Sequence, residues 1–436
     1  MILAYLFIIL IIGLYKSKNK NDDYIFDSRR LTLPAFIATF VTTWYGGILE
    51  IGRFTFQNGI ITWIIFGLFY YISAFLLLKF IAPKIHKNNI ETIPNYIHKN
   101  YGYISGLMSS IIISLITSPA PYLIIFATIF NHIYNLNYLI TISIGMFFSV
   151  FYIILGGFKS IIRTDKFQFI LMYLGFILLL INLYTTYGGL SFLIENSPKD
   201  HFNLNNKLPI SYIISWFFIS MITFIDPNIF HRIYSAKNEK ILKKGIFLSI
   251  LLWIIFDFLT ITAGLYASAI IKEVNITHSP YLILSAITLS PLMRDFFIIS
   301  LLSVVMSTID SFTFTSAVTI GKELKNNKSS EYNTKIGLIL TSIITLALCM
   351  FFERVIDIWY IFGSLGVSTL LVPLIFSILK INRENHNNAK IIVIPLIVFI
   401  IWNYFDNPFL IDSIYVGLFT SLFLNYFFLV KRVDNN

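Results

Sequence analysis

The chain has 436 residues, of which 57% are hydrophobic and only 12% charged, and apolar runs recur from one end to the other. This composition excludes a soluble domain with a single anchor and predicts an all-α polytopic membrane protein. The formal net charge is +10. Because the basic residues are spread over alternate loops, this charge indicates membrane topology and not a nucleic-acid partner.

Membrane-spanning helices need about 20 mostly apolar residues each. About thirteen segments meet this requirement, at residues 1–15, 33–56, 60–82, 104–131, 136–156, 167–187, 209–231, 245–267, 295–320, 335–352, 355–380, 390–404 and 411–430. The first segment could instead be a signal peptide. It has no basic start and no small-residue cleavage site, so we expect a retained helix.

Lys and Arg gather in every second loop, for example in KSKNKNDDYIFDSRR, KSIIRTDK and HRIYSAKNEKILKK. Loops rich in these residues face the cytoplasm. The N-terminus is therefore predicted outside and the C-terminus inside, in a multi-pass protein of the bacterial inner membrane. The longest segments on the outer side, 188–208 and 268–294, are expected to form short helices or loops.

The whole chain, 1–436, is predicted to be one membrane domain built around two five-helix halves. Residues 1–32 supply the first helix and a cytoplasmic loop, 33–188 and 209–380 the two halves, and 390–436 two C-terminal helices. Because five is odd, the second half starts on the opposite side of the membrane and is inverted. Inverted repeats are typical of transporters, in which the first helix of each repeat is broken at the membrane midplane.

Both of these first helices carry residues that weaken a helix. In the first half, the stretch TTWYGGILEIGR contains the Gly46-Gly47 pair, which lets backbone carbonyls leave the helical ladder. In the second half, the stretch SWFFISMITFIDPNIF contains Asp226-Pro227, where proline removes a hydrogen bond. The alternative is two ordinary kinked helices. The stretch TSPAPY, with Pro119 and Pro121, is expected to expose carbonyls beside Ser118.

A polar cluster lies inside the ninth apolar segment, where VVMSTIDSF places Ser307, Thr308, Asp310 and Ser311 within five residues. At about 100° per residue these four side chains share one face of a helix. A charged aspartate at the helix centre costs about 2.5–3.5 kcal/mol, so it needs a partner, a cavity or an ion. Oxygen ligands with a carboxylate suit a small hard cation. The alternative is that the hydroxyls bond back to carbonyls and Asp310 lies near water.

Four motifs in this order resemble the sodium:solute symporter family. DDYIFDSRR is similar to the family's DYFLAGR stretch, GGFKSIIRTDKFQ to its GGxxAVxxTDxxQ loop, DPNIFHRIYSAKN to its xPxxxQRxxAAKS element, and VVMSTIDS to its AxMST stretch. The resemblance covers about residues 22–325. It implies the leucine-transporter fold, with two inverted five-helix repeats.

The resemblance also implies residues for the coupling ion, Na⁺. Its common sodium site corresponds here to the carbonyls of Thr42, Tyr45 and Val304 and the hydroxyls of Ser307 and Thr308. A second cation site, present in some members, corresponds to Asp165, Ser307, Asp310 and Ser311. The chain departs from the family pattern in three places: Asp310 stands where relatives usually have serine, His231-Arg232 replaces a Gln-Arg pair, and Trp44 and Tyr45 replace smaller or aliphatic residues.

Charged residues at membrane depth have two interpretations each. Glu50 and Arg53 are three residues apart, so they either form an internal ion pair or contact the substrate at an outer gate. Asp257 is expected to face the helix bundle. The substrate-binding candidates, with Tyr122 and Trp216 as gates, are Thr43, Trp44, Gly47, Glu50, Arg53, Ser118, Ser220 and Thr223.

The sequence thus predicts a secondary active transporter that moves a small polar solute, an amino acid, monocarboxylate or sugar, into the cell with sodium. Alternatives are proton coupling, a transporter-like sensor, and a membrane enzyme. An enzyme would need a cluster of His, Asp, Glu or Cys at one membrane face, whereas the seven histidines are scattered along loops. The single cysteine, Cys349, excludes a disulfide framework. We expect no cofactor, no partner beyond solute, sodium and the lipid bilayer, and a functional monomer.

Overall fold

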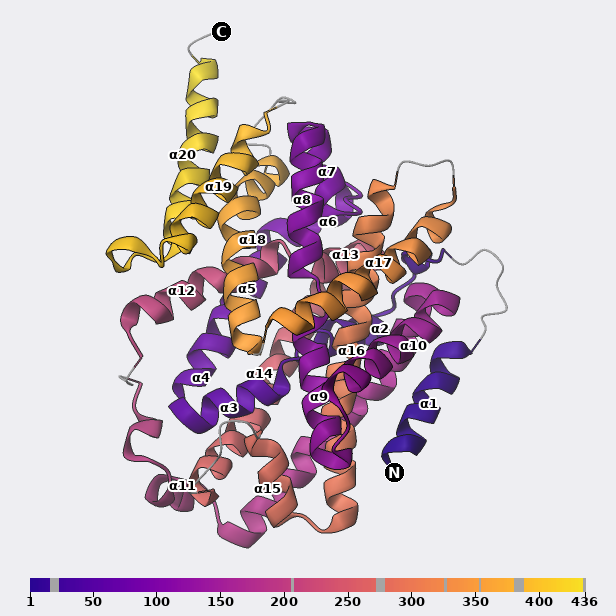
Figure 1. Ribbon diagram of the computed structural model, residues 1–436, viewed down its shortest axis with the longest axis vertical. Helices are drawn as coiled ribbons and strands as arrows, with labels where there is room; N and C mark the ends of the chain where they lie inside the picture. The colour runs from indigo at the N-terminus through magenta and orange to yellow at the C-terminus, as the bar shows by residue number, and fades with distance from the viewer. Residues whose placement is uncertain are drawn as a thin grey trace.

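The computed structural model describes residues 1–15, 23–204, 208–271, 279–324, 328–352, 354–379 and 388–433. These residues form helices and no strand, apart from one isolated bridge between Leu31 and Ala236 (Figure 1). Within them, eight helices or broken helices are long and apolar enough to cross a membrane, and four shorter apolar helices accompany them. The chain is a multi-pass membrane protein. The number of thirteen spans and the sidedness of the termini stay predictions.

The first half of the chain begins with α1 (Ile2–Leu14) and ends with α10 (Tyr138–Tyr187). The helices between them are α2 (Leu33–Thr42), α3 (Ile48–Asn58), α4 (Ile61–Trp63), α5 (Phe69–Leu76), α6 (Ala82–Lys87), α7 (Ile93–Tyr101), α8 (Tyr103–Ile116) and α9 (Ala120–Tyr134). Two π-helical segments, Ile64–Leu68 and Leu77–Ile81, join α4 to α5 and α5 to α6. The predicted third span is therefore one continuous helical rod.

The second half of the chain follows two short elements on the predicted outer side, α11 (Leu190–Asn196) and a 3-10 turn at Lys199–Phe202. Its helices are α12 (Ile210–Ser220), α13 (Pro227–Ser235), α14 (Glu239–Ile270), α15 (Pro280–Thr288), α16 (Pro291–Glu323), α17 (Ser330–Phe351), α18 (Val355–Ile378), α19 (Lys390–Tyr404) and α20 (Ser413–Val433). The predicted outer segments 188–208 and 268–294 thus contain the short helices α11 and α15. Figure 1 shows both toward the end where the N-terminus lies, with the C-terminus at the opposite end.

The two predicted helix breaks are present. The helix ends at Thr42 and restarts at Ile48, with residues 43–47 between α2 and α3. In the second half, α12 ends at Ser220, a 3-10 turn covers Met221–Phe224, and α13 starts after its N-cap Asp226, whose side chain accepts from the Asn228 backbone N–H at 2.7 Å. A third break, at residues 117–119, separates α8 from α9.

The loop predicted between residues 156 and 167 is wrong in its length, because the connection is a turn at a single residue. Two helices, together labelled α10 (Tyr138–Tyr187), meet at Gly157, which has φ 58° and ψ −152°. A side chain there would be strained, and a Cβ would lie 2.4 Å from the carbonyl oxygen of Tyr24 and 2.7 Å from a carbon of its ring. The charged residues that suggested a loop are instead helical, and they carry Asp165 into the protein interior.

Helix α16 lies at the centre of the bundle, where it contacts α10, α17, α9 and α8. Of the residues in its most apolar stretch 94% are buried, against 33% for α17. Helix α17 exposes Ile339, Ile343 and Met350, as expected for a lipid-facing surface. The polar residues of α16 can therefore be satisfied only by other protein groups or by bound ligands.

Candidate functional site

The break between α2 and α3 lies directly against α16. Gly46 makes this approach possible: a Cβ at this position would lie 2.5 Å from Cβ of Thr308 and 2.5 Å from a ring carbon of Tyr122. Any other residue would push the break away from the helix. The glycine pair predicted to weaken the second span therefore also lets the backbone of that span approach the ninth span, α16.

Thr308 joins the break to α16. Its hydroxyl lies 3.2 Å from the carbonyl oxygen of Thr42 and 3.1 Å from that of Val304. A threonine hydroxyl has one proton to donate, so one of the two carbonyl oxygens keeps a lone pair for another partner. Three groups of the predicted sodium site are thus together, within a fully buried region.

The other two groups predicted for the sodium site belong to Ser307, on α16, and Tyr45, in the break. Ser307 is the neighbour of Thr308 on α16, and its hydroxyl donates to Asp165 at 2.6 Å. Tyr45 lies in the break, with its phenol donating to the Trp253 carbonyl at 3.0 Å. Carbonyl and hydroxyl oxygens beside a carboxylate fit a hard cation such as Na⁺. Among the described residues, no group of three His, Cys, Asp or Glu could hold a metal.

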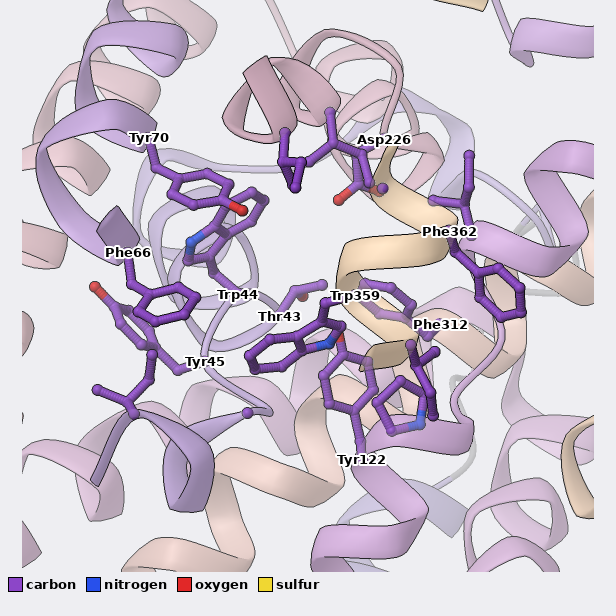
Figure 2. A pocket seen from close by; sticks show the side chains of 18 of the residues that line it. Thr43, Trp44, Tyr45, Phe66, Tyr70, Tyr122, Asp226, Phe312, Trp359 and Phe362 are labelled. Atoms are coloured by element: carbon purple, nitrogen blue, oxygen red, sulfur yellow. The ribbon is translucent and has the colours of Figure 1, made fainter. Parts of the chain in front are cut away.

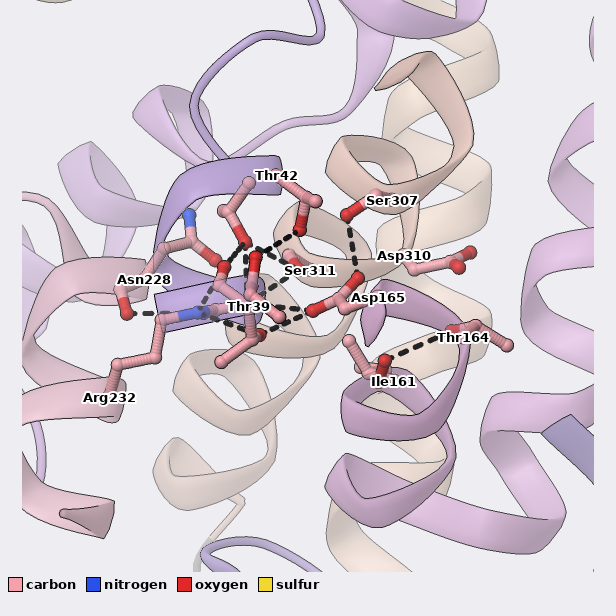
Figure 3. A network of polar contacts seen from close by, with 12 residues as sticks. Thr39, Thr42, Ile161, Thr164, Asp165, Asn228, Arg232, Ser307, Asp310 and Ser311 are labelled. Carbon is pink, nitrogen blue, oxygen red and sulfur yellow. Dashed lines mark hydrogen bonds and ion pairs between the residues drawn. The ribbon is translucent and has the colours of Figure 1, made fainter. Parts of the chain in front are cut away.

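Arg232 extends this polar region toward α13 (Figure 3). Its Nε donates to the carbonyl and hydroxyl oxygens of Thr39 at 3.0 and 3.1 Å. Its Nη2 donates to Thr43 at 2.6 Å and to Ser311 at 2.7 Å, and lies 3.8 Å from an Asp165 oxygen. Thr39 in turn donates to Asp165. A buried guanidinium therefore links α13, α2, α10 and α16.

Asp310 turns away from this network. Its carboxylate accepts hydrogen bonds from Ser149, at 2.5 Å, and from Tyr152, both in the first part of α10. Figure 3 shows it beyond Asp165, pointing away from Arg232. The structure therefore brings Asp165 and Ser307 into contact and binds Ser311 to Arg232, while Asp310 has other partners. The polar residues of α16 do not all face one site.

A cavity of about 120 Å³ lies beside the break. Its wall includes four predicted residues and one predicted gate: Thr43, Trp44, Gly47, Ser118 and Tyr122. Figure 2 shows Trp44, Tyr70 and Trp359 around the space, with the Asp226 carboxylate pointing into it. Thr43 belongs to both the cavity wall and the Arg232 network, so the two regions share a residue of the break.

The cavity lining combines aromatic rings with two carboxylates. The rings are those of Trp44, Tyr45, Phe66, Tyr70, Tyr122, Phe312, Trp359 and Phe362, and the carboxylates are Asp226 and Asp257. None of the described lining residues is Lys, Arg or His. Aromatic faces and carboxylates both attract positive charge. As predicted, Asp257 is buried in the bundle, where it accepts a hydrogen bond from Tyr71.

Several predicted substrate residues lie outside this cavity lining. Glu50 and Arg53 pair with each other, the first of the two interpretations given for them: Nη1 of Arg53 lies 3.0 Å from Oε2 of Glu50. Ser220 bonds to Ser73 at 2.9 Å, and Thr223 to the Ser220 carbonyl at 2.7 Å. The predicted gate Trp216 packs edge to face against Phe66.

Sequence reasoning did not assign a role in the site to Tyr70, Trp359 or Arg232. The two aromatics lie on helices with many other aromatic residues, so no local pattern singles them out. A basic residue soon after a helix break is a usable signal, but the charged loop that follows Arg232 concealed it. His231, expected in a loop, is instead buried in α13 and stacks on Phe26.

The sequence of the chain is similar to those of known transporters. The sequence model of the sodium:solute symporter family matches residues 24–403. The chain is 25% identical over 338 residues to sodium/proline symporter 2 of Staphylococcus saprophyticus, and 24% identical to the sodium/proline symporter of Staphylococcus aureus. Each match covers 71% of this chain, and the chain spans 65% of the length of these relatives.

Solved structures share the fold. A Na⁺-coupled sialic acid symporter in a substrate-bound outward-open state superposes with a TM-score of 0.79 at 16% identity, covering 97% of this chain and 94% of that one. The nucleobase-cation-symport-1 family transporter Mhp1, in a closed conformation, gives 0.64 at 13% identity, with 95% and 96% covered. The leucine-transporter fold implied by the sequence motifs is thus the fold of these neighbours. With its family model matched over most of its length, the chain belongs to the sodium:solute symporter family.

Proposed function

We propose that the chain is a sodium-coupled symporter of the bacterial inner membrane that carries a small solute inward by alternating access. One observation carries this proposal. The Thr308 hydroxyl contacts the carbonyl oxygens of Thr42 and Val304, and the break next to this contact also forms part of the cavity wall. A sodium ion there would be held by these oxygens with those of Tyr45 and Ser307. Residues 33–188 and 209–380 would act as the inverted repeats.

Coupling would follow from the shared break. An ion between α2 and α16 fixes residues 43–47, and these residues carry Thr43, Trp44 and Gly47 into the cavity wall. Sodium therefore selects the conformation that binds solute. Coupling free energy is reciprocal, so solute raises the sodium affinity by the same factor. Ser307 and Thr308 are the residues on which this linkage depends most.

An amino acid is the solute class that the cavity favours among those predicted. Two carboxylates, with no basic residue among the described lining, attract the ammonium group that an amino acid carries and that a monocarboxylate or a sugar lacks. A ring of aromatic faces contributes further attraction for a positive charge. The named relatives are sodium/proline symporters, and proline carries such an amine. Proline is therefore the first solute to test, followed by other amino acids and betaines.

A thermal-shift screen identifies the solute. We expect an amine-bearing solute such as proline to raise the unfolding midpoint of the purified protein more in sodium than in potassium buffer. A ligand at about 100 times its Kd stabilises the native state by about 2.7 kcal/mol. Lactate and glucose serve as the anionic and uncharged comparisons. A shift that is the same in both salts contradicts sodium coupling.

Removing either cavity carboxylate tests how the amine is bound. Asp226→Asn keeps the N-cap of α13, because asparagine caps as well as aspartate, and Asp257→Asn keeps an acceptor for Tyr71. We expect each variant to bind the amine-bearing solute about 10- to 100-fold more weakly, since a hydrogen bond to a charged group is worth about 1.5–3 kcal/mol. The matched control Asp357→Asn, whose side chain is half-exposed, should bind normally. Unchanged affinity in both cavity variants contradicts the assignment.

A further inference from the structure

The solute cavity carries more negative charge than one ammonium group can neutralise. Asp226 and Asp257 both line it, and each is only 5% exposed. Within the part of the chain that the structure describes, neither carboxylate lies within salt-bridge distance of a Lys, Arg or His, and Arg232 pairs with Asp165. A buried charge without a partner of opposite sign is strongly unfavourable. A solute with a single ammonium group would leave one of the two carboxylates unpaired.

The proposed sodium ion does not supply the missing positive charge. Its ligands are carbonyl and hydroxyl oxygens around Thr308, and the carboxylate beside them is Asp165, which accepts from Ser307 at 2.6 Å. Asp226 and Asp257 are not among these groups. The compensating charge is therefore expected to arrive with the solute.

The two carboxylates lie on different sides of the cavity. Asp257 is on the side of Phe66, because a Cβ on the next residue, Gly67, would lie 3.1 Å from Oδ2 of Asp257. Asn228 donates twice to Oδ1 of Asp226, at 2.7 and 3.1 Å. Figure 2 shows this carboxylate pointing into the space from the side opposite Phe66. A single ammonium group can therefore contact only one of the two, whereas two ammonium groups joined by a short chain can contact both.

The wall between the carboxylates suits such a chain. Figure 2 shows the rings of Trp44 and Trp359 between Phe66 and Asp226, and the ring centroids of Phe66 and Trp359 are 6.3 Å apart. Aromatic faces pack against methylene groups and attract cations. A carboxylate on the solute also has a partner, because α3 starts at the cavity wall with Gly47 as its N-cap and no side chain caps it. The free N–H groups of a helix N-terminus bind anions.

We propose that the solute is a basic amino acid, one that carries a second ammonium group on its side chain, as lysine and ornithine do. The inference rests on the proposed sodium-coupled transport of an amino acid and narrows the class of that amino acid. The two ammonium groups pair with Asp226 and Asp257, and the methylene chain lies along the aromatic rings. The carboxylate of the solute faces the start of α3.

A matched pair of amino acids tests the proposal. Lysine and norleucine have side chains with the same number of carbon atoms, but that of norleucine ends in a methyl group and carries no charge. We expect lysine to bind about 10- to 100-fold more tightly, because only lysine gains the second pair of charged hydrogen-bonding groups. Thermal shifts of the purified protein, measured in sodium buffer over a range of amino-acid concentrations, give the two dissociation constants.

The outcomes of this comparison separate the inference from the proposed function. If norleucine and proline bind in sodium buffer as tightly as lysine, the second ammonium group has no partner. The inference is then overturned, while sodium-dependent binding of amino acids stands. If none of the three binds, the proposed amino-acid transport itself fails. Cadaverine, which is lysine without its carboxylate, should bind more weakly than lysine. Tighter binding of cadaverine would make the solute a diamine and overturn the amino-acid assignment.

Removing each carboxylate assigns the two ammonium groups. We expect one of Asp226→Asn and Asp257→Asn to bind lysine and norleucine about equally, because it has lost the partner of the side-chain ammonium group. The other should weaken the binding of both amino acids by the same factor. The half-exposed control Asp357→Asn should keep the natural preference for lysine. An unchanged preference in both folded cavity variants overturns the pairing. If neither variant folds, the comparison of lysine with norleucine in the natural protein decides the question.

Discussion

Thr308→Ala is expected to raise the sodium concentration for half-maximal solute uptake by about 10- to 100-fold. The alanine removes the hydroxyl that lies 3.2 Å from the Thr42 carbonyl and 3.1 Å from the Val304 carbonyl. An interaction with a charged group is worth about 1.5–3 kcal/mol, and about 1.4 kcal/mol corresponds to a tenfold change in affinity. Uptake into proteoliposomes, measured over a range of sodium concentrations, gives the shift. Ser307→Ala should act in the same direction.

Thr319 provides the matched control for Thr308. It lies on the same helix, is also buried, and its hydroxyl donates to the Thr315 carbonyl one turn earlier, at 2.9 Å. Thr319→Ala should leave the sodium dependence unchanged. If both alanine variants shift the sodium dependence equally, the effect is a general loss of helix packing and Thr308 has no special role.

Gly46→Ala is expected to abolish sodium-dependent uptake while the protein still folds. The added Cβ would meet Cβ of Thr308 and a ring carbon of Tyr122, both at 2.5 Å. Neither atom is at the flexible end of a side chain, so the break must move away from α16. Overpacking of this kind costs about 1–3 kcal/mol. The same shift separates the Thr42 carbonyl from Thr308, so sodium should no longer stabilise the protein in a thermal-shift experiment.

Gly145, in α10, is the control for this glycine substitution. A Cβ there would lie 2.8 Å from two ring carbons of Phe126, so this alanine also overpacks the interior, but away from the break. Gly145→Ala should therefore keep sodium-dependent uptake and the thermal response to sodium. Retention of both in Gly46→Ala would mean that close contact between the break and α16 is not needed for coupling.

The all-helical membrane fold and the two helix breaks could be predicted because hydrophobic length and the weakening of helices by glycine and proline are local properties. Gly46-Gly47 and Asp226-Pro227 mark the breaks where the structure has them. The segment after Gly157 could not be predicted in the same way. Its lysine and arginine residues suggest a loop, whereas the fold covers this segment and continues the helix through Asp165.

The site itself was predictable only in part. Thr308 and Ser307 follow from a sequence motif, and Thr308 does contact the predicted carbonyls. The direction of Asp310 depends on Ser149 and Tyr152, which come from a distant part of the chain. The same is true of the cavity, whose aromatic lining comes from helices far apart in sequence. Helical periodicity gives the face of one helix, but not the partner that each residue on that face meets.

Uptake of labelled proline, or of the solute that the thermal-shift screen identifies, into proteoliposomes under an inward sodium gradient tests the central claim of sodium-coupled symport most directly. The predicted result is accumulation above the external concentration, which disappears when a sodium ionophore collapses the gradient. Uptake that is equal with and without the sodium gradient, or that a proton gradient alone drives to the same level, would contradict it.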